Sequence, residues 1–123
     1  MDPIDQGDDT TSPLDPEWNI FFRHGKAELD GPAQTLLGRH ARALNENRRK
    51  ILLLRAYTND LGSRSLNTVV ADQRLSSIKR FLLSKGVRRA QIRLLSSGGE
   101  TPAKSCRSEA CQLRWQRVEL KFR

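Results

Sequence analysis

The stretch from Leu52 to Leu83 constrains the fold more than any other part of this chain. It opens within a short apolar run, Ile51 to Tyr57, which has the length of a β-strand. A polar turn over residues 59–63 follows, and Gly86 is expected to end the helix that comes next. Apolar residues of this helix recur at intervals of three and four, which places them on one face: Leu66, Val69, Val70, Ile78, Phe81 and Leu82. The pattern predicts a strand, a polar turn and a helix, with a site expected at the turn.

The remaining segments predict three further strands and one further helix. Strands are expected at Trp18 to Phe22, at Gln91 to Ser96 and at Gln116 to Phe122, the last of which alternates apolar and polar residues. A helix is expected to begin at Gly31-Pro32, because proline suits a first helical turn. Its apolar face carries Ala33, Leu36, Leu37, His40, Ala41 and Leu44. His40 is therefore predicted to pack into the core rather than to bind a ligand.

This order of elements predicts the architecture. Strand, helix, strand, helix, strand, strand indicates parallel strands joined by helices, closed by a hairpin. The expected fold is an α/β (α+β) two-layer sandwich with a mixed four-stranded sheet and both helices on one face. The segment that carries Cys106 and Cys111, up to about Leu113, is expected to be a loop.

Charge divides the chain into two parts. Residues 1–17 hold six acids and no Lys or Arg, so the other 106 residues hold all 22 basic residues against 14 − 6 = 8 acids, a balance of +14. Residues 1–16 contain three prolines and little to bury, which predicts a disordered acidic leader before a single domain at 17–123. The basic part is expected to attract anions, or else to be a solvated surface without a dedicated partner.

Several classes of site are not supported by the residues. The two cysteines match no zinc pattern, because His24 and His40 are remote from them in sequence. The cysteines could form a small disulfide or stay as two free thiols, and the residues alone do not decide between these alternatives. No nucleophile–base grouping and no phosphate-binding glycine loop is present, so neither an enzyme nor a cofactor or metal is expected. Nucleic acid is not expected either, because the aromatic residues fall mostly in predicted strands. A membrane is expected only through a segment outside this chain, since the longest apolar runs are four residues.

A series of short motifs, in a consistent order, identifies a family. Their residues are Phe22-Arg23-His24-Gly25-Lys26-Ala27-Glu28-Leu29, Ala56-Tyr57-Thr58-Asn59, Gly62-Ser63, Leu66-Asn67, Val70 to Leu75, Gly86-Val87, Gly99-Glu100-Thr101-Pro102 and Arg117-Val118-Glu119. Over Trp18 to Phe122 the chain resembles the OmpA-like C-terminal domain, a periplasmic module that anchors outer-membrane proteins, lipoproteins and motor proteins to peptidoglycan. The resemblance favours a disulfide between Cys106 and Cys111 and a periplasmic location associated with the outer membrane or cell envelope.

The resemblance also implies a binding site for the peptidoglycan stem peptide. In the family, an Asp at the strand end and an Arg on the helix hold the diamino acid, and Arg74 occupies the Arg position. The Asp position is Asn59, which can accept a hydrogen bond but cannot balance an ammonium group. Thr58 and Asn67 are expected to complete the polar lining. Asp60 is the nearest carboxylate, although a one-residue shift at a strand end normally reverses the side-chain direction.

Two further residues depart from the family pattern, and three hypotheses about function remain. Ala56 in place of Gly and Leu75 in place of Ala are expected to add bulk beside the pocket. The first hypothesis is a non-catalytic peptidoglycan anchor that uses Thr58, Asn59, Asn67 and Arg74. The second is a domain of the same fold that has lost this ligand and serves as a protein-interaction element of an envelope complex. The third is a cytosolic basic module that binds nucleic acid, for which free thiols and a steep salt dependence would be evidence.

Overall fold

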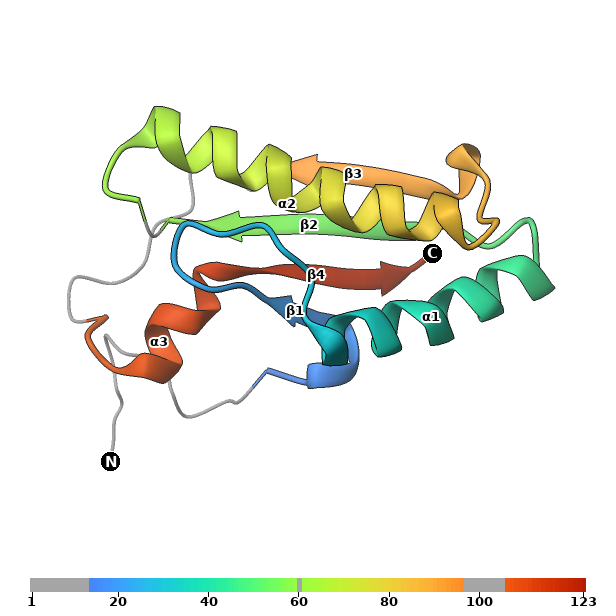
Figure 1. Ribbon diagram of the computed structural model, residues 1–123, viewed down its shortest axis with the longest axis horizontal. Helices are drawn as coiled ribbons and strands as arrows, with labels where there is room; N and C mark the ends of the chain where they lie inside the picture. Colours follow the sequence, from blue (N-terminus) through green and yellow to red (C-terminus); the bar gives the residue numbers. More distant parts are fainter. Residues whose placement is uncertain (1–13, 60, 97–105) are drawn as a thin grey trace.

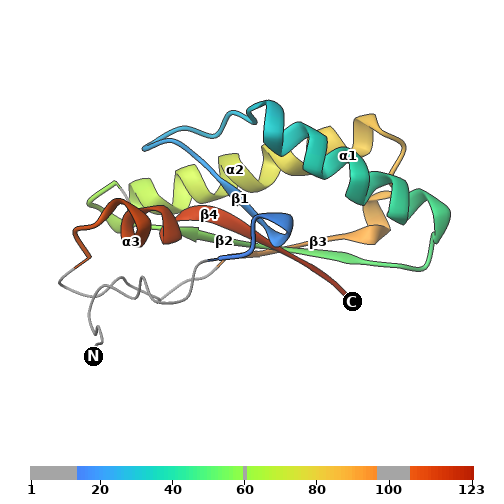
Figure 2. The same cartoon turned by 90° about the horizontal axis from the view of Figure 1, so that it is seen from below.

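The computed structural model describes residues 14–59, 61–96 and 106–123, and these form one sheet with two long helices on one of its faces (Figure 1). The strands are β1 (Asn19–Phe21), β2 (Leu52–Thr58), β3 (Ile92–Ser96) and β4 (Gln116–Phe122). The helices are α1 (Gly31–Glu46), α2 (Arg64–Ser84) and α3 (Glu109–Arg114), with short 3-10 turns η2 (Pro16–Trp18) and η3 (Arg89–Gln91). Seen from below, α1 and α2 lie side by side over the sheet (Figure 2). The predicted two-layer α/β architecture is confirmed.

The sheet order is β1-β4-β2-β3, which corrects the predicted closing hairpin. β4 pairs antiparallel with both β1 and β2, with Val118 opposite Ile20 on one side and Ala56 on the other. β3 lies at the edge and pairs only with β2, in parallel. β3 and β4 follow each other in the chain but are not neighbours in the sheet. Residues 97–115 separate them, and only a short loop would force two consecutive strands to pair as a hairpin.

The first helix follows its sequence pattern closely. Asp30 caps α1, since its carboxylate accepts a hydrogen bond of 2.9 Å from the Ala33 amide, and Pro32 lies in the first turn. All six residues predicted for the apolar face are buried, including His40, which is 4% exposed. The His40 ring stacks on Trp18 and its Nε2 lies 3.0 Å from the Glu17 carbonyl oxygen. The prediction of a packed histidine is confirmed.

The buried face of α2 differs from the prediction at its N-terminal half. Leu66 and Val69 are 51% and 50% exposed, so their assignment to the apolar face was wrong. The residues of α2 that face the core are instead spaced by four, three and four: Ala71, Leu75, Ile78 and Leu82. Arg74 is buried among them. The stop at Gly86 is confirmed: its φ is +91°, and the Val87 amide beyond it donates to the Leu82 carbonyl.

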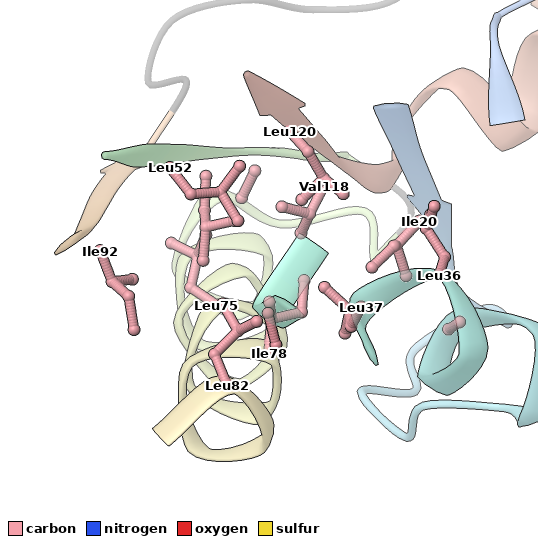
Figure 3. Close-up of a cluster of buried hydrophobic side chains, with 14 of the residues drawn as sticks. Ile20, Leu36, Leu37, Leu52, Leu75, Ile78, Leu82, Ile92, Val118 and Leu120 are labelled. Atoms are coloured by element: carbon pink, nitrogen blue, oxygen red, sulfur yellow. The ribbon is translucent and has the colours of Figure 1, made fainter. Parts of the chain in front are cut away.

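The hydrophobic core fills the space between the sheet and the two long helices (Figure 3). Both layers contribute, and the buried residues that Figure 3 labels are Ile20, Leu36, Leu37, Leu52, Leu75, Ile78, Leu82, Ile92, Val118 and Leu120. Among the described residues, none of the helices is both long and apolar enough to cross a membrane.

The loop predicted between the cysteines and Leu113 is partly helical. α3 begins after Ser108, whose hydroxyl accepts a hydrogen bond of 3.1 Å from the Cys111 amide, and Glu109 lies in the first turn. This serine–glutamate pair is a helix start signal that the sequence already contained. The Gly99-Glu100-Thr101-Pro102 motif lies outside the described residues.

Candidate functional site

The candidate site lies at the end of the sheet where β2 finishes and α2 begins, near the connection between β1 and α1 (Figure 1). Thr58 is the last residue of β2, and the Asn59 amide that follows donates to the Trp115 carbonyl at 2.9 Å. Ser63 caps α2 by accepting a hydrogen bond of 3.2 Å from the Leu66 amide. These local bonds fix the path of the chain from strand to helix and hold the polar side chains at one place.

Asn59 and Asn67 form a direct side-chain pair. The Asn67 amide group donates to the Asn59 side-chain oxygen at 2.9 Å, and the Asn67 side-chain oxygen accepts from the Leu61 amide at 2.9 Å. Asn67 therefore bridges the first turns of α2 to the turn that follows β2. The Asn59 side-chain oxygen already accepts a hydrogen bond from Asn67. A ligand donor would therefore have to share this oxygen with Asn67 or displace the Asn67 amide group from it.

Arg74 is fully buried and holds three parts of the molecule together. Its Nε donates to the Lys26 carbonyl at 2.7 Å, Nη2 to the Arg23 carbonyl at 3.1 Å and Nη1 to the Thr58 hydroxyl at 3.1 Å. The guanidinium carbon also lies 5.2 Å from the centre of the Phe22 ring. A buried arginine is tolerated because its donors are satisfied. Arg74 thus fastens the β1–α1 connection to the end of β2.

A cavity of about 620 Å³ lies on the other side of that connection. Its lining includes Arg23 and Lys26, whose carbonyls bind Arg74, together with Leu113 and Gln112 of α3. A ligand in this cavity would contact the β1–α1 connection from outside, while Arg74 holds the same connection from inside.

The structure brings the four predicted site residues together as two pairs, Thr58 with Arg74 and Asn59 with Asn67. Ala56 and Leu75 are 1% and 4% exposed and belong to the hydrophobic core. Asp60 lies outside the described residues.

Sequence reasoning missed the acceptors of Arg74 at residues 23 and 26, because a backbone carbonyl leaves no residue-type signal. It also missed the ring of Phe22 beneath the guanidinium, since an aromatic residue in a strand is equally typical of a core position.

The two cysteines are joined. Cys106 and Cys111 form a disulfide with a Cα–Cα distance of 5.4 Å, and Cys111 is buried at the start of α3. This confirms the disulfide that the resemblance favoured over free thiols. No group of three or more metal-ligating side chains occurs within the described parts of the chain.

Comparison with known proteins identifies relatives of this chain. The sequence model of the OmpA family matches residues 21–114. A peptidoglycan-associated lipoprotein of Pseudomonas aeruginosa is 30% identical over 102 residues, which is 83% of this chain and 60% of that protein. A similar lipoprotein of Mesorhizobium japonicum is 29% identical over 75% of this chain and 55% of its own length. The chain thus spans between half and two thirds of these curated relatives.

Solved structures agree with this assignment. The crystal structure of the peptidoglycan-associated lipoprotein from Burkholderia pseudomallei superposes with a TM-score of 0.78 at 26% identity, covering 94% of this chain and 97% of that one. The C-terminal domain of Helicobacter pylori MotB superposes with a TM-score of 0.71 at 20% identity, covering 85% and 83% of the two chains, and shows the shared fold.

Proposed function

Because the chain belongs to the OmpA family, we propose that it is a non-catalytic domain of the bacterial cell envelope that binds the stem peptide of peptidoglycan. In this proposal the domain lies in the periplasm and tethers an outer-membrane, lipoprotein, motor or secretion component to the cell wall. Several of its relatives bear the name peptidoglycan-associated lipoprotein, which supports the choice of ligand.

The observation that carries the proposal is the convergence of four side chains from two elements. Thr58 and Asn59 come from the end of β2, and Asn67 and Arg74 come from α2, yet hydrogen bonds of 3.1 Å and 2.9 Å join them across the turn. Guanidinium and amide groups suit the carboxylate, ammonium and amide groups of a peptide.

Binding a carboxylate through Arg74 requires an exchange of partners. The guanidinium donates to the Lys26 and Arg23 carbonyls, which are neutral acceptors. A ligand carboxylate would replace these neutral acceptors with one of opposite charge, which can bind the guanidinium through two parallel hydrogen bonds. The β1–α1 connection would move away as the carboxylate enters. Asn59 would accept a hydrogen bond from the ligand amine without balancing its charge, so we expect weaker binding than an Asp at this position would give.

The second candidate is a domain that has given up this ligand and serves as a protein-interaction element of an envelope complex. Two observations favour it: Arg74 has no exposed surface, and the side-chain oxygen of Asn59 is occupied by Asn67. In this alternative Arg74 has a structural role, and partner proteins bind elsewhere on the domain.

An NMR titration with a diaminopimelate-containing stem peptide distinguishes the two candidates. We expect saturable shifts at Thr58, Asn59 and Asn67 in the wild-type domain. The Asn59→Asp variant should bind more tightly by roughly tenfold, because the ligand ammonium group then meets a carboxylate of opposite charge instead of a neutral amide oxygen. Gln73→Glu is the matched control, since it makes the same charge change at an exposed position of α2.

Each outcome of the titration decides between the candidates. Binding by wild type, tightened only in Asn59→Asp, supports the anchor. Binding that appears only in Asn59→Asp supports the protein-interaction alternative. If neither protein shows any shift at these residues, stem-peptide binding at this site is refuted.

A further inference from the structure

The end of the molecule opposite the candidate site is strongly basic. β2 and α2 run in opposite directions, so the start of β2 and the end of α2 lie at one end, together with the C-terminus (Figures 1 and 2). The α1–β2 connection, the α2–β3 connection and the last residue contribute seven cations there, which we call the basic pole: Arg48, Arg49, Lys50, Lys85, Arg88, Arg89 and Arg123. With its 21 residues at about 1.5 Å each, α2 separates this pole from the candidate site by about 30 Å.

Buried hydrogen bonds hold these connections together. Gln91 is 2% exposed, and its side-chain amide donates to the carbonyls of Leu44, Asn47 and Lys50 at 2.8, 3.1 and 3.0 Å. Its side-chain oxygen accepts from the Arg88 amide at 3.2 Å. The Arg123 amide donates to the Ile51 carbonyl at 2.8 Å. The cations of the basic pole therefore sit on a fixed framework although they are distant in sequence.

Among the described residues, no side-chain carboxylate balances the cations of the basic pole. Arg48 donates to the Asn45 side chain and to the Gly86 carbonyl, and Lys50 lies over the Phe122 ring, so these contacts are with neutral groups. Across the described residues, no ion pair joins a carboxylate to any of these seven side chains. The two connections contain no acid, and Glu46 is the last residue of α1, just before the first of them. The charge is thus free to act on an external anion.

The composition of the basic pole specifies the anion. Five of its seven cations are arginines, whose planar guanidinium groups bind phosphate oxygens in pairs. Arginine is therefore suited to a surface that presents many phosphates. Single-stranded nucleic acid also presents phosphates, but it requires exposed aromatic side chains for stacking. The aromatic residue next to Lys50 is Phe122, which packs edge-on against Trp18 and His40 instead.

We propose that the basic pole binds the phosphate-bearing surface of an anionic phospholipid membrane. The choice of phospholipid over other polyanions rests on the envelope location proposed above. Because the basic pole and the candidate site lie at opposite ends, the domain would contact the membrane with one end and present its peptide site away from it. The basic pole then acts as a second attachment of the domain, independent of stem-peptide binding.

Co-sedimentation of the full chain with vesicles tests the proposal. We expect binding to phosphatidylcholine vesicles that contain phosphatidylglycerol, none to pure phosphatidylcholine, and a loss of binding as salt is raised. The triple variant Arg49→Gln, Arg89→Gln and Arg123→Gln should weaken the vesicle affinity by about a hundredfold, since each basic residue near an anionic surface contributes severalfold. These three side chains are exposed and form no hydrogen bond with the described part of the chain, so the fold should be retained.

A second triple variant is the matched control. Arg23→Gln, Arg64→Gln and Arg107→Gln remove the same charge from exposed positions away from the basic pole. This control should bind vesicles within about threefold of wild type. An equal loss in both triple variants would overturn the proposal, because binding would then follow net charge alone. Failure of the wild type to bind phosphatidylglycerol vesicles, or tighter binding to duplex DNA at equal phosphate concentration, would overturn it as well.

Discussion

Replacing Arg74 with methionine tests whether this arginine stabilises the domain as the hydrogen bonds indicate. The change removes a buried cation that donates to the Lys26, Arg23 and Thr58 oxygens at 2.7, 3.1 and 3.1 Å. Methionine is of similar length and still reaches the Phe22 ring, so the apolar contact is largely kept. The perturbation therefore isolates the polar role of Arg74.

The expected loss follows from the bonds that are broken. A hydrogen bond from a charged donor contributes about 1.5–3 kcal/mol, so three independent bonds would give about 4.5–9 kcal/mol. The three bonds share one side chain and are not additive, and the substitution also removes the desolvation cost of the buried guanidinium, so the loss should lie at or below the low end of that sum. We expect Arg74→Met to lower the free energy of unfolding by about 3–5 kcal/mol.

Urea denaturation at neutral pH, followed by tryptophan fluorescence with the disulfide intact, measures this loss. Arg80→Met is the control, because Arg80 lies on the same helix with an exposed side chain, and its loss should stay below about 0.5 kcal/mol. If Arg74→Met were destabilised by less than about 1 kcal/mol, Arg74 would not hold the β1–α1 connection and the structural argument would fail.

Two further stability measurements probe other parts of the fold. Burial lowers the pKa of Arg117 because it desolvates the guanidinium, although Glu119 and Tyr57 oppose the shift. Its Nε lacks a hydrogen-bond partner among the described residues. The desolvation penalty is present at every pH below the folded-state pKa, and it offsets the hydrogen bond of 2.9 Å that Arg117 donates to the Asn19 side chain. Arg117→Met should therefore change the free energy of unfolding by no more than about 1 kcal/mol at neutral pH; a loss like that of Arg74→Met would contradict this. The Cys106–Cys111 disulfide closes a short loop, with a sequence separation of 5. Reducing it should lower the free energy of unfolding, measured in urea, by about 2 kcal/mol. An unchanged urea midpoint would show that the crosslink does not constrain the unfolded chain.

The contrast between the two buried arginines shows what sequence patterns leave open. Arg74 falls among apolar residues of a helix, and Arg117 alternates with apolar residues of a strand, yet both are less than 10% exposed. Arg74 donates to oxygens of Lys26, Arg23 and Thr58. Arg117 instead stacks on Tyr57, with its guanidinium carbon 4.0 Å from the ring centre, and donates to the Asn19 side chain at 2.9 Å, while its Nε finds no partner among the described residues. Their partners come from segments that the sequence does not place beside them.

Local patterns determined most of the secondary structure. The caps at Asp30 and Ser63, the left-handed glycine at Gly86 and the alternation in β4 each depend on neighbouring residues, so they could be read without knowledge of the fold. The apolar face of α1 was predicted in full for the same reason. The positions of Thr58, Asn59, Asn67 and Arg74 were predicted from the family resemblance, and their peptide-binding role stays a prediction.

Tertiary structure decided the rest. The place of β4 between β1 and β2 depends on long-range pairing, which a connection as long as residues 97–115 does not specify. Leu66 and Val69 fit the helical spacing of the apolar residues, yet both are exposed. Only the packing of α2 against the sheet decides which of its residues are buried. The basic pole likewise combines connections that lie far apart in sequence and that Gln91 fastens through three carbonyls. Short-range hydrogen bonds and periodicity are encoded along the chain, whereas burial and shared surfaces arise only when distant segments meet.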